Sequence, residues 1–167
     1  MIARILVALD GSPRAPGVFD AAAQVGARFG ATLFPFRALF VPPEFPAAAA
    51  GSRADALPHH LTKTALDELL RLTGRPAPRG VRVDAPTVRL GTPWRLILEL
   101  SDELDVDLIV MGSHGYNALD ALLGTTAARV ANLARRHVFV VHSRGEQVVQ
   151  LDPASSPYRE SGGRPEP

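Results

Sequence analysis

Asp105 to His142 read DVDLIVMGSHGYNALDALLGTTAARVANLARRHVFVVH, the segment that is most informative about the architecture. Within it, Leu108 to Met111 is a short and unbroken apolar run, which is typical of a parallel strand buried on both faces. Glycine-rich sequence follows this strand, and Gly124, Thr125 and Thr126 then open an alanine-rich helical pattern. The segment therefore predicts a buried strand, a glycine loop and a helix.

The loop and the helix start have the chemistry of a phosphate site. The loop begins with Gly112-Ser113-His114-Gly115. Glycines let backbone N–H groups approach an anion closely, and a helix N-terminus adds unpaired N–H donors and the positive end of its dipole. An ordinary strand-to-helix turn also favours glycine, because it needs residues that tolerate positive φ. From this feature alone, both interpretations stay open.

The wider pattern resembles the nucleotide-binding signature of the universal stress protein family. The pattern consists of Gly-x-x-Gly, a spacer with apolar positions, Gly-Thr-Thr and a helix. The spacer, Tyr116 to Leu123, has eight residues, one fewer than is usual in the family. The resemblance covers residues 2 to 143 and implies that the chain binds ATP, with or without Mg²⁺.

Length and composition narrow the class of protein. The 167 residues suit one domain, and the hydrophobic fraction of 46% and charged fraction of 21% are those of a soluble globular protein. A formal net charge of +1 favours neither nucleic acid nor an anionic membrane as a partner. Lys63 is the single lysine and no Gly-Lys-Ser/Thr sequence occurs, which argues against a Walker-type nucleotidase. Cysteine is absent, as are a signal-like N-terminus and a membrane-spanning apolar run, so we expect a cytoplasmic protein.

A second strand-and-turn pattern opens the chain. Ile2 to Leu9 is a β-rich run, and Asp10-Gly11-Ser12-Pro13 follows it. We expect a helix after this turn, with Ser12 as its cap and Pro13 in its first turn. Apolar residues at helical spacing give this helix one face that packs on the sheet, and they are Val18, Ala22, Val25 and Phe29.

Asp10 has two open interpretations. It lies at the carboxyl end of a strand, the edge where open α/β sheets bind their ligands. An aspartate at this position is also a common acceptor in an Asx turn, which needs no ligand. The first strand of the family ends in a similar sequence, so the resemblance implies that Asp10 faces the bound nucleotide.

A second strand is predicted over Leu33 to Val41. Pro35 lacks the N–H that a central ladder needs, so either the paired strand starts at Phe36 or a bulge lies at the proline. The resemblance implies that the end of this strand contacts adenine through its backbone, and Ala38 is the matching position.

The remaining sequence continues the alternation of helices and strands. Pro42 to His60 is rich in proline and alanine and predicts a long loop. Thr92 as N-cap and Pro93 at the first position predict a helix whose first turn carries Trp94 as a packing residue. We expect the other elements to be a helix over Leu61 to Leu72, a strand over Val81 to Val88 and a last strand over Val138 to Val141.

This alternation predicts a parallel sheet with helices on both faces, because parallel strands are joined by right-handed crossovers. The resemblance implies an α/β fold with a Rossmann-like open sheet of five parallel strands in the order 3-2-1-4-5. In this order Asp10 and Gly112 end neighbouring strands at the topological switch point, where a ligand crevice opens. The two loops that carry the motifs are therefore expected to meet.

The resemblance implies a nucleotide site that draws on several segments of the chain. Its residues, matched position by position, are Ala8, Leu9, Asp10, Ala38, Met111, Gly112, Ser113, His114, Gly115, Gly124, Thr125 and Thr126. No metal site is expected, because the adjacent His59 and His60 cannot share one face of a regular element and no third ligand accompanies them.

These observations lead to one functional hypothesis and two alternatives. We expect residues 1–143 to form a universal stress protein-like domain that binds ATP and dimerises through its last strand. In a stress response, its bound state would regulate either an unknown protein partner or its own assembly. Residues 144–167, rich in proline, glycine and serine, are expected to be a disordered tail. No nucleophile–base pair or acidic cluster predicts efficient catalysis. The alternatives are a non-nucleotide dimeric interaction module, which the shorter spacer favours, and a slow ATPase.

Overall fold

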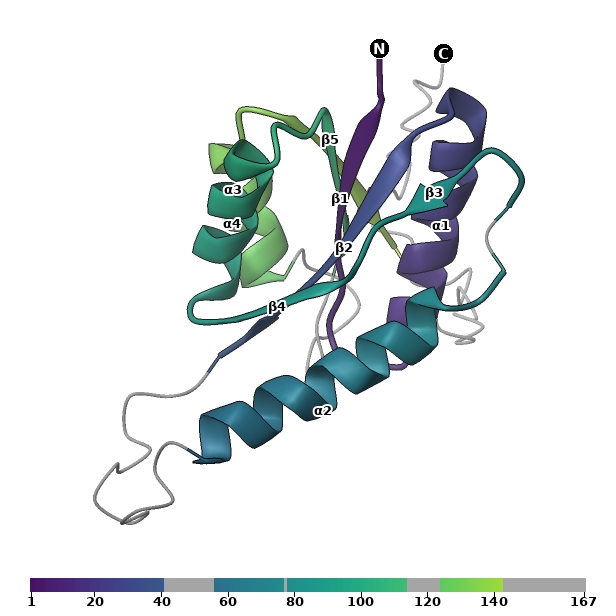
Figure 1. Cartoon of the computed structure of the whole chain (residues 1–167). Helices are drawn as coiled ribbons and strands as arrows, with labels where there is room; N and C mark the ends of the chain where they lie inside the picture. Colours follow the sequence, from purple (N-terminus) through teal and green to yellow (C-terminus); the bar gives the residue numbers. More distant parts are fainter. Residues whose placement is uncertain (41–55, 77, 114–123, 143–167) are drawn as a thin grey trace, which may run out of the picture.

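The computed structural model describes residues 1–40, 56–76, 78–113 and 124–142, which form a parallel β-sheet with helices on both faces (Figure 1). The strands are β1 (Arg4–Ala8), β2 (Thr32–Leu39), β3 (Arg82–Val83), β4 (Thr87–Leu90), β5 (Leu108–Gly112) and β6 (His137–Val141). The helices are α1 (Ala15–Phe29), α2 (Ala56–Thr73), α3 (Pro93–Glu103) and α4 (Thr125–Leu133). Among the helices described, none has the length and apolar character needed to cross a membrane.

The sheet has the strand order β3-β2-β1-β5-β6, and each described strand pair is parallel. β4 also pairs with β2, further along the same edge. This topology confirms the predicted Rossmann-like α/β fold. The sheet has six strands rather than five, because the predicted third strand is split into β3 and β4.

The hydrophobic core has two layers, which the sheet separates. α1 and α2 cover one face of the sheet, and α3 and α4 cover the other (Figure 1). Successive residues of β1 alternate between the layers: Ile5 and Val7 enter the cluster below α1, and Leu6 enters the cluster below α3 and α4. All three side chains are fully buried. β1 is therefore covered on both faces, as its apolar sequence predicts.

Pro35 lies inside β2 without interrupting it, so the predicted start of the paired strand at Phe36 is wrong. β2 begins before the proline, and Pro35 pairs with Val7 of β1. The Leu33 C=O accepts a hydrogen bond from Asp84 N–H (2.9 Å), on the side of β2 that faces away from β1. Alternate residues of a strand share a side, so the N–H that proline lacks would also face this outer neighbour.

The outer neighbour is interrupted where the proline faces it. Leu33 pairs with Val83 and Phe36 pairs with Thr87, so the outer strand holds one residue more than β2 over this interval. The extra residue is a bulge, which separates β3 from β4. The predicted alternative, a bulge at Pro35, is thus realised in the partner strand rather than in β2 itself.

The start of α1 differs from the prediction. The helix begins at Ala15, whose N–H donates to the Ser12 C=O (3.1 Å). The Ser12 hydroxyl accepts a hydrogen bond from Arg14 N–H (3.3 Å), so Ser12 closes a turn before the helix instead of capping it. Pro16, rather than Pro13, lies in the first helical turn.

Two other helix ends also differ from the prediction. Phe29 is 52% exposed rather than packed on the sheet, because it is the last residue of α1 before Gly30 reverses the chain at φ +66°. α2 begins at Ala56, inside the predicted loop and ahead of Leu61. Pro58 lies in the first turn of α2. Proline is tolerated there because the N–H that it lacks would have no acceptor within the helix.

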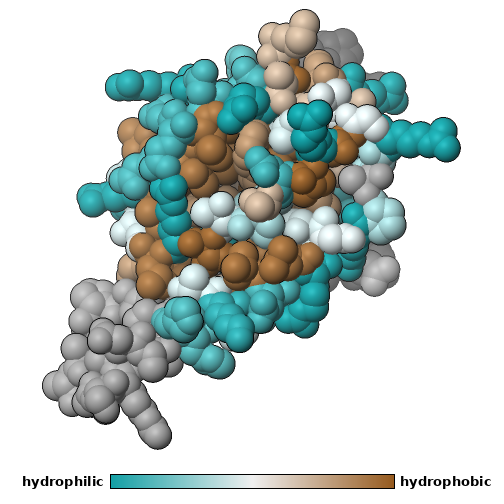
Figure 2. Space-filling view, in the orientation of Figure 1, coloured by the Kyte–Doolittle hydropathy of each residue, from teal (hydrophilic) through white to brown (hydrophobic). Residues whose placement is uncertain are grey.

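The outer edge of the sheet is short and divided. The face shown in Figure 2 carries β3, β4 and α2, and hydrophobic residues are exposed on it between hydrophilic ones. Leu90 of β4 and Leu61 and Leu70 of α2 are among the exposed large apolar side chains. Arg89 of β4 forms an ion pair with Glu103 of α3, with 2.6 Å between Nη2 and Oε2. A short, bulged and charged edge is poorly suited to pairing with a further strand.

Asp107 ties the amino end of β1 to the start of β5. Its Oδ2 accepts hydrogen bonds from Ala3 N–H (2.8 Å) and Arg4 N–H (2.9 Å). These two hydrogen bonds, from Ala3 and then from Arg4, hold the pKa of the Asp107 carboxyl below its usual value. The carboxylate sets the register of the two strands directly before their ladder begins at Ile5 and Leu108.

We expect Asp107→Asn to remove a pH-dependent part of the stability. A carboxyl whose pKa is lowered by folding contributes its full stability above the unfolded-state pKa and loses it as the pH falls through the folded-state pKa. At neutral pH the melting temperature of the variant should lie roughly 3 °C below that of the wild type. Thermal unfolding by circular dichroism should show this difference closing below about pH 4. A difference that stays constant from neutral to acidic pH would contradict the role assigned to Asp107.

Candidate functional site

The carboxyl ends of β1, β2 and β5 form one edge of the sheet, which we name the switch-point edge. Ala8 pairs with Met111 at the ends of β1 and β5, and Leu9 N–H donates to the Phe36 C=O of β2 (2.8 Å). Beyond this edge, β1 leads into α1 on one face of the sheet and β5 leads towards α4 on the other (Figure 1). Open α/β sheets bind their ligands at such a divergence.

Two backbone hydrogen bonds attach the glycine motif to the switch-point edge. Ser113 N–H donates to the Val141 C=O of β6 (2.9 Å), and Gly124 N–H donates to the Ser113 C=O (2.8 Å). Ser113 is 5% exposed. The hydrogen bonds bring the start of α4 against the end of β5, although residues 114–123 separate them in the sequence.

The start of α4 offers backbone donors to an anion. Gly124 is the N-cap, and among the described residues no side chain caps this helix. Ala128 N–H donates to the Gly124 C=O (2.9 Å), so the donors without a helical partner are those of the first turn, which Thr125 and Thr126 open. Thr125 is exposed and Thr126 is half-buried. The positive end of the helix dipole adds to the attraction for an anion at this place.

Asp10 is hydrogen-bonded within its own turn. Its Oδ1 accepts from Ser12 N–H (3.0 Å) and from the Ser12 hydroxyl (2.6 Å). The Asx-turn interpretation of Asp10 therefore holds. The residue is exposed, and an ionised carboxylate has about four acceptor positions. The turn thus leaves capacity on Asp10 for a ligand hydroxyl.

Ala38 lies on β2 beyond the end of β1. The last residues paired between the two strands are Ala8 and Phe36, and the Phe36 C=O faces β1, where it accepts from Leu9 N–H. The backbone groups of alternate residues point to the same side of a strand, so the N–H and C=O of Ala38 also point to the side of β1. They lie beyond Ala8 and Phe36, the last residues that pair between the two strands. The predicted adenine-contact position therefore directs a donor and an acceptor over the switch-point edge.

Arg37 is a charged residue at this edge that the sequence reasoning missed. Its Nη1 donates to Glu68 Oε2 of α2 (2.6 Å), and its side chain is 17% exposed. A Cβ added to Gly11 would lie 2.2 Å from Arg37 Nη2, so the guanidinium rests directly against Gly11. The feature of the sequence that could have indicated Arg37 is that it is the single charged residue in this otherwise mostly apolar strand, next to Ala38.

Of the remaining residues for which the sequence makes a prediction, only some lie in the part of the chain that the structure describes. His114, Gly115, the spacer that follows them and the predicted tail lie outside the described residues. Trp94 packs against the cluster below α3 and α4, as predicted, with the guanidinium groups of Arg95 and Arg129 at 5.1 and 5.3 Å from its ring centre. In the described part of the chain, no three His, Cys, Asp or Glu side chains are placed to hold a metal.

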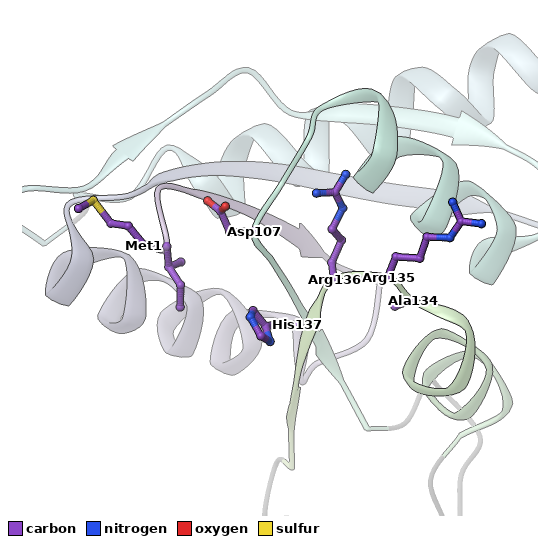
Figure 3. Close-up of a pocket in the computed structure, with 7 residues that line it drawn as sticks. Met1, Asp107, Ala134, Arg135, Arg136 and His137 are labelled. Carbon is purple, nitrogen blue, oxygen red and sulfur yellow. The ribbon is translucent and has the colours of Figure 1, made fainter.

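A shallow pocket of about 390 Å³ lies at the opposite edge of the sheet (Figure 3). Its lining residues are Met1, Ile2, Asp107, Ala134, Arg135, Arg136 and His137. Asp107 is engaged by backbone N–H groups at the start of β1, and Arg136 pairs with Asp105 (2.9 Å). The pocket is at the amino ends of β1 and β6, away from Asp10 and Gly112, and none of the predicted site residues lines it.

The fold and the switch-point edge define a Rossmann-like α/β protein, in which a glycine motif and a helix N-terminus lie at that edge. The chain belongs to the universal stress protein family, whose model matches residues 1–142. Universal stress protein A homolog 1 of Coxiella burnetii (strain RSA 493 / Nine Mile phase I) is 33% identical over 144 residues, which are 82% of this chain and 94% of that protein.

Solved structures share the fold. Hypothetical protein MJ0577 superposes with a TM-score of 0.74 at 22% identity, over 87% of this chain and 99% of that one. A universal stress protein in complex with cAMP has a TM-score of 0.57 at 26% identity, over 84% of this chain and 97% of that one. These superpositions confirm the predicted fold, and the match to the family model confirms the predicted family.

We expect Asp10→Ala to destabilise the protein without ligand. The change leaves the N–H and the hydroxyl of the buried Ser12 without their acceptor, which should lower the free energy of unfolding by about 1–2 kcal/mol. Asp10→Asn keeps a side-chain oxygen for Ser12 and should lose much less stability. Urea unfolding of both variants measures the two losses, and equal losses would contradict the turn role of Asp10.

Proposed function

We propose that this protein binds an adenine nucleotide, ATP, at the switch-point edge and acts through binding rather than through turnover. The observation that carries the proposal is the hydrogen bond from Gly124 N–H to the Ser113 C=O (2.8 Å), which sets the donors of the α4 start beside the end of β5. The relative solved with cAMP supports an adenine nucleotide as the class of ligand. The protein with bound ATP, with or without Mg²⁺, would regulate a protein partner in a stress response.

Each part of the nucleotide has a proposed partner in this chain. The first-turn N–H groups of α4 and the backbone at Gly112 would bind the phosphates, together with the His114 and Gly115 positions of the sequence motif. Asp10 would accept a hydrogen bond from a ribose hydroxyl. The N–H and C=O of Ala38 form a donor and acceptor pair, which complements the acceptor nitrogen and the amino group of adenine.

A non-nucleotide interaction module of the same fold is the second candidate. The observation that favours it is the spacer of eight residues from Tyr116 to Leu123, one fewer than is usual in the family. A shorter spacer changes where the glycine loop meets the helix start, and phosphate binding depends on that geometry. The two candidates differ in a single measurable property, the affinity for ATP.

We also propose that two copies pair through β6. The Val141 C=O accepts from Ser113 N–H, so Val141 and every second residue before it direct their backbone groups towards the β5 side. Val138 and Val140 therefore direct theirs to the open side of β6, the last strand of the described sheet. This edge has no proline or lysine, and Phe139 is 42% exposed. An antiparallel strand from a second copy would pair these groups around a twofold axis.

Calorimetric titration with ATP and magnesium chloride tests the proposed function. We expect wild-type protein to bind ATP at sub-millimolar concentration. Asp10→Asn should weaken binding roughly tenfold, because it removes a charge-assisted hydrogen bond but keeps the turn. Lys63→Ala, at an exposed position on α2, is the matched control and should bind as the wild type does. Wild-type protein that binds no adenine nucleotide would favour the interaction module instead.

Sedimentation tests the proposed dimer. Val140→Pro removes an N–H that faces the open edge, so the variant should be a folded monomer. Phe139→Pro is the matched control, because it removes an N–H that faces β5 and should unfold the β5–β6 ladder. Wild-type protein that sediments as a monomer at concentrations on the order of tens of micromolar would contradict the dimer.

A further inference from the structure

Arg37 joins three parts of the molecule at the switch-point edge. Its backbone belongs to β2, and its Nη1 donates to Glu68 of α2 (2.6 Å). Its Nη2 lies against Gly11, where an added Cβ would come within 2.2 Å. Gly11 stands between Asp10 and Ser12, whose hydrogen bonds form the Asx turn. The guanidinium therefore rests on the turn that holds the Asp10 carboxylate.

The geometry of Arg37 differs from that of a comparable ion pair in the same sheet. Arg89 of β4 donates hydrogen bonds to Glu103 from both terminal nitrogens (2.8 and 2.6 Å), and its side chain is 34% exposed. Arg37 is 17% exposed and gives one terminal nitrogen to Glu68, while the other faces Gly11. An exposed ion pair contributes little stability by itself. The contacts of Arg37 are instead those of a residue that holds a neighbouring segment, the turn containing Gly11, in position.

Glu68 and Gly11 explain how such placement works. α2 is anchored to the core by Ala65 and Leu69, which are 3% and 2% exposed. Glu68 precedes Leu69, so its carboxylate holds the guanidinium from a fixed helix. Glycine has more backbone freedom than any other residue, and a guanidinium packed against Gly11 restricts that freedom. The absence of a side chain at position 11 is also what lets Arg37 reach this place.

We infer that Arg37 is a positioning residue for the nucleotide. It holds the turn from Asp10 to Ser12 in place, and so presents the Asp10 carboxylate to a ribose hydroxyl. Glu68 acts through Arg37, which makes α2 part of the support of the switch-point edge. This inference rests on the proposed function, because it names a residue that prepares the same site.

A double-mutant cycle on ATP affinity tests this role. Arg37→Met keeps an apolar stem of similar length and should weaken ATP binding roughly fivefold in the wild-type background. In the Asp10→Asn background the same change should cost less than about twofold, because Arg37 acts through Asp10. Arg89→Met is the matched control and should leave ATP affinity unchanged. Equal losses in the two backgrounds would mean that Arg37 binds the ligand directly and would overturn the positioning role.

Amide hydrogen exchange without ligand tests the same turn independently of ATP. The Ser12 N–H donates to Asp10, so it should exchange roughly fivefold faster in Arg37→Met and Glu68→Gln than in the wild type. Arg89→Met should leave this rate unchanged. A lower melting temperature of Arg37→Met with wild-type exchange at Ser12 would overturn the inference. If the wild type binds no ATP, the proposed function fails, and the exchange rates still decide whether Arg37 holds the turn.

Discussion

The other elements of the fold are arranged around β1, which is buried at the centre of the sheet. Ile5, Leu6 and Val7 are fully buried, and β1 pairs with β2 on one side and β5 on the other. Parallel neighbours are reached only through crossovers, and each crossover helix must cover one face of the sheet. α1 and α4 cover opposite faces, so the chain diverges at the ends of β1 and β5. The packing that builds the core thus also produces the switch-point edge.

Aspartates hold β1 near both of its ends, with different chemical consequences. Asp107 accepts two backbone N–H groups from the amino end of β1, and these hydrogen bonds lower its pKa. At the carboxyl end, Asp10 binds Ser12 through one oxygen and is exposed to solvent. Each carboxylate accepts two hydrogen bonds through one oxygen, but Asp107 aligns two strands at the amino edge of the sheet, whereas Asp10 lies at the switch-point edge. The place in the fold, and not the residue type, separates the structural role of Asp107 from the proposed ligand role of Asp10.

Arginine side chains connect the sheet to its helices and loops. The hydrogen bond to Arg89 holds the pKa of the Glu103 carboxyl below its usual value, and the same bond raises the pKa of Arg89. Such exposed pairs add little to stability. Arg37 is more enclosed, and its guanidinium contacts both Glu68 and the backbone of Gly11. The long and planar guanidinium can serve two neighbours at once, which a lysine ammonium does less well.

Apolar periodicity, glycine turns and proline positions are local properties of the chain, so the order of strands and helices could be predicted from the sequence. The meeting of the two motifs followed from the strand order that the family resemblance implies. Within the candidate site, Asp10 and the start of α4 could be identified because they follow a predicted strand or open a predicted helix, whereas Ala38 was matched through the family resemblance. The place of Pro35 inside β2 could not be predicted from the sequence, because the direction of its missing N–H matters only relative to a neighbouring strand. The role of Arg37 also needed the tertiary structure: its partner Glu68 is 31 residues away, and no local pattern encodes a contact set by the packing of α2 on the sheet.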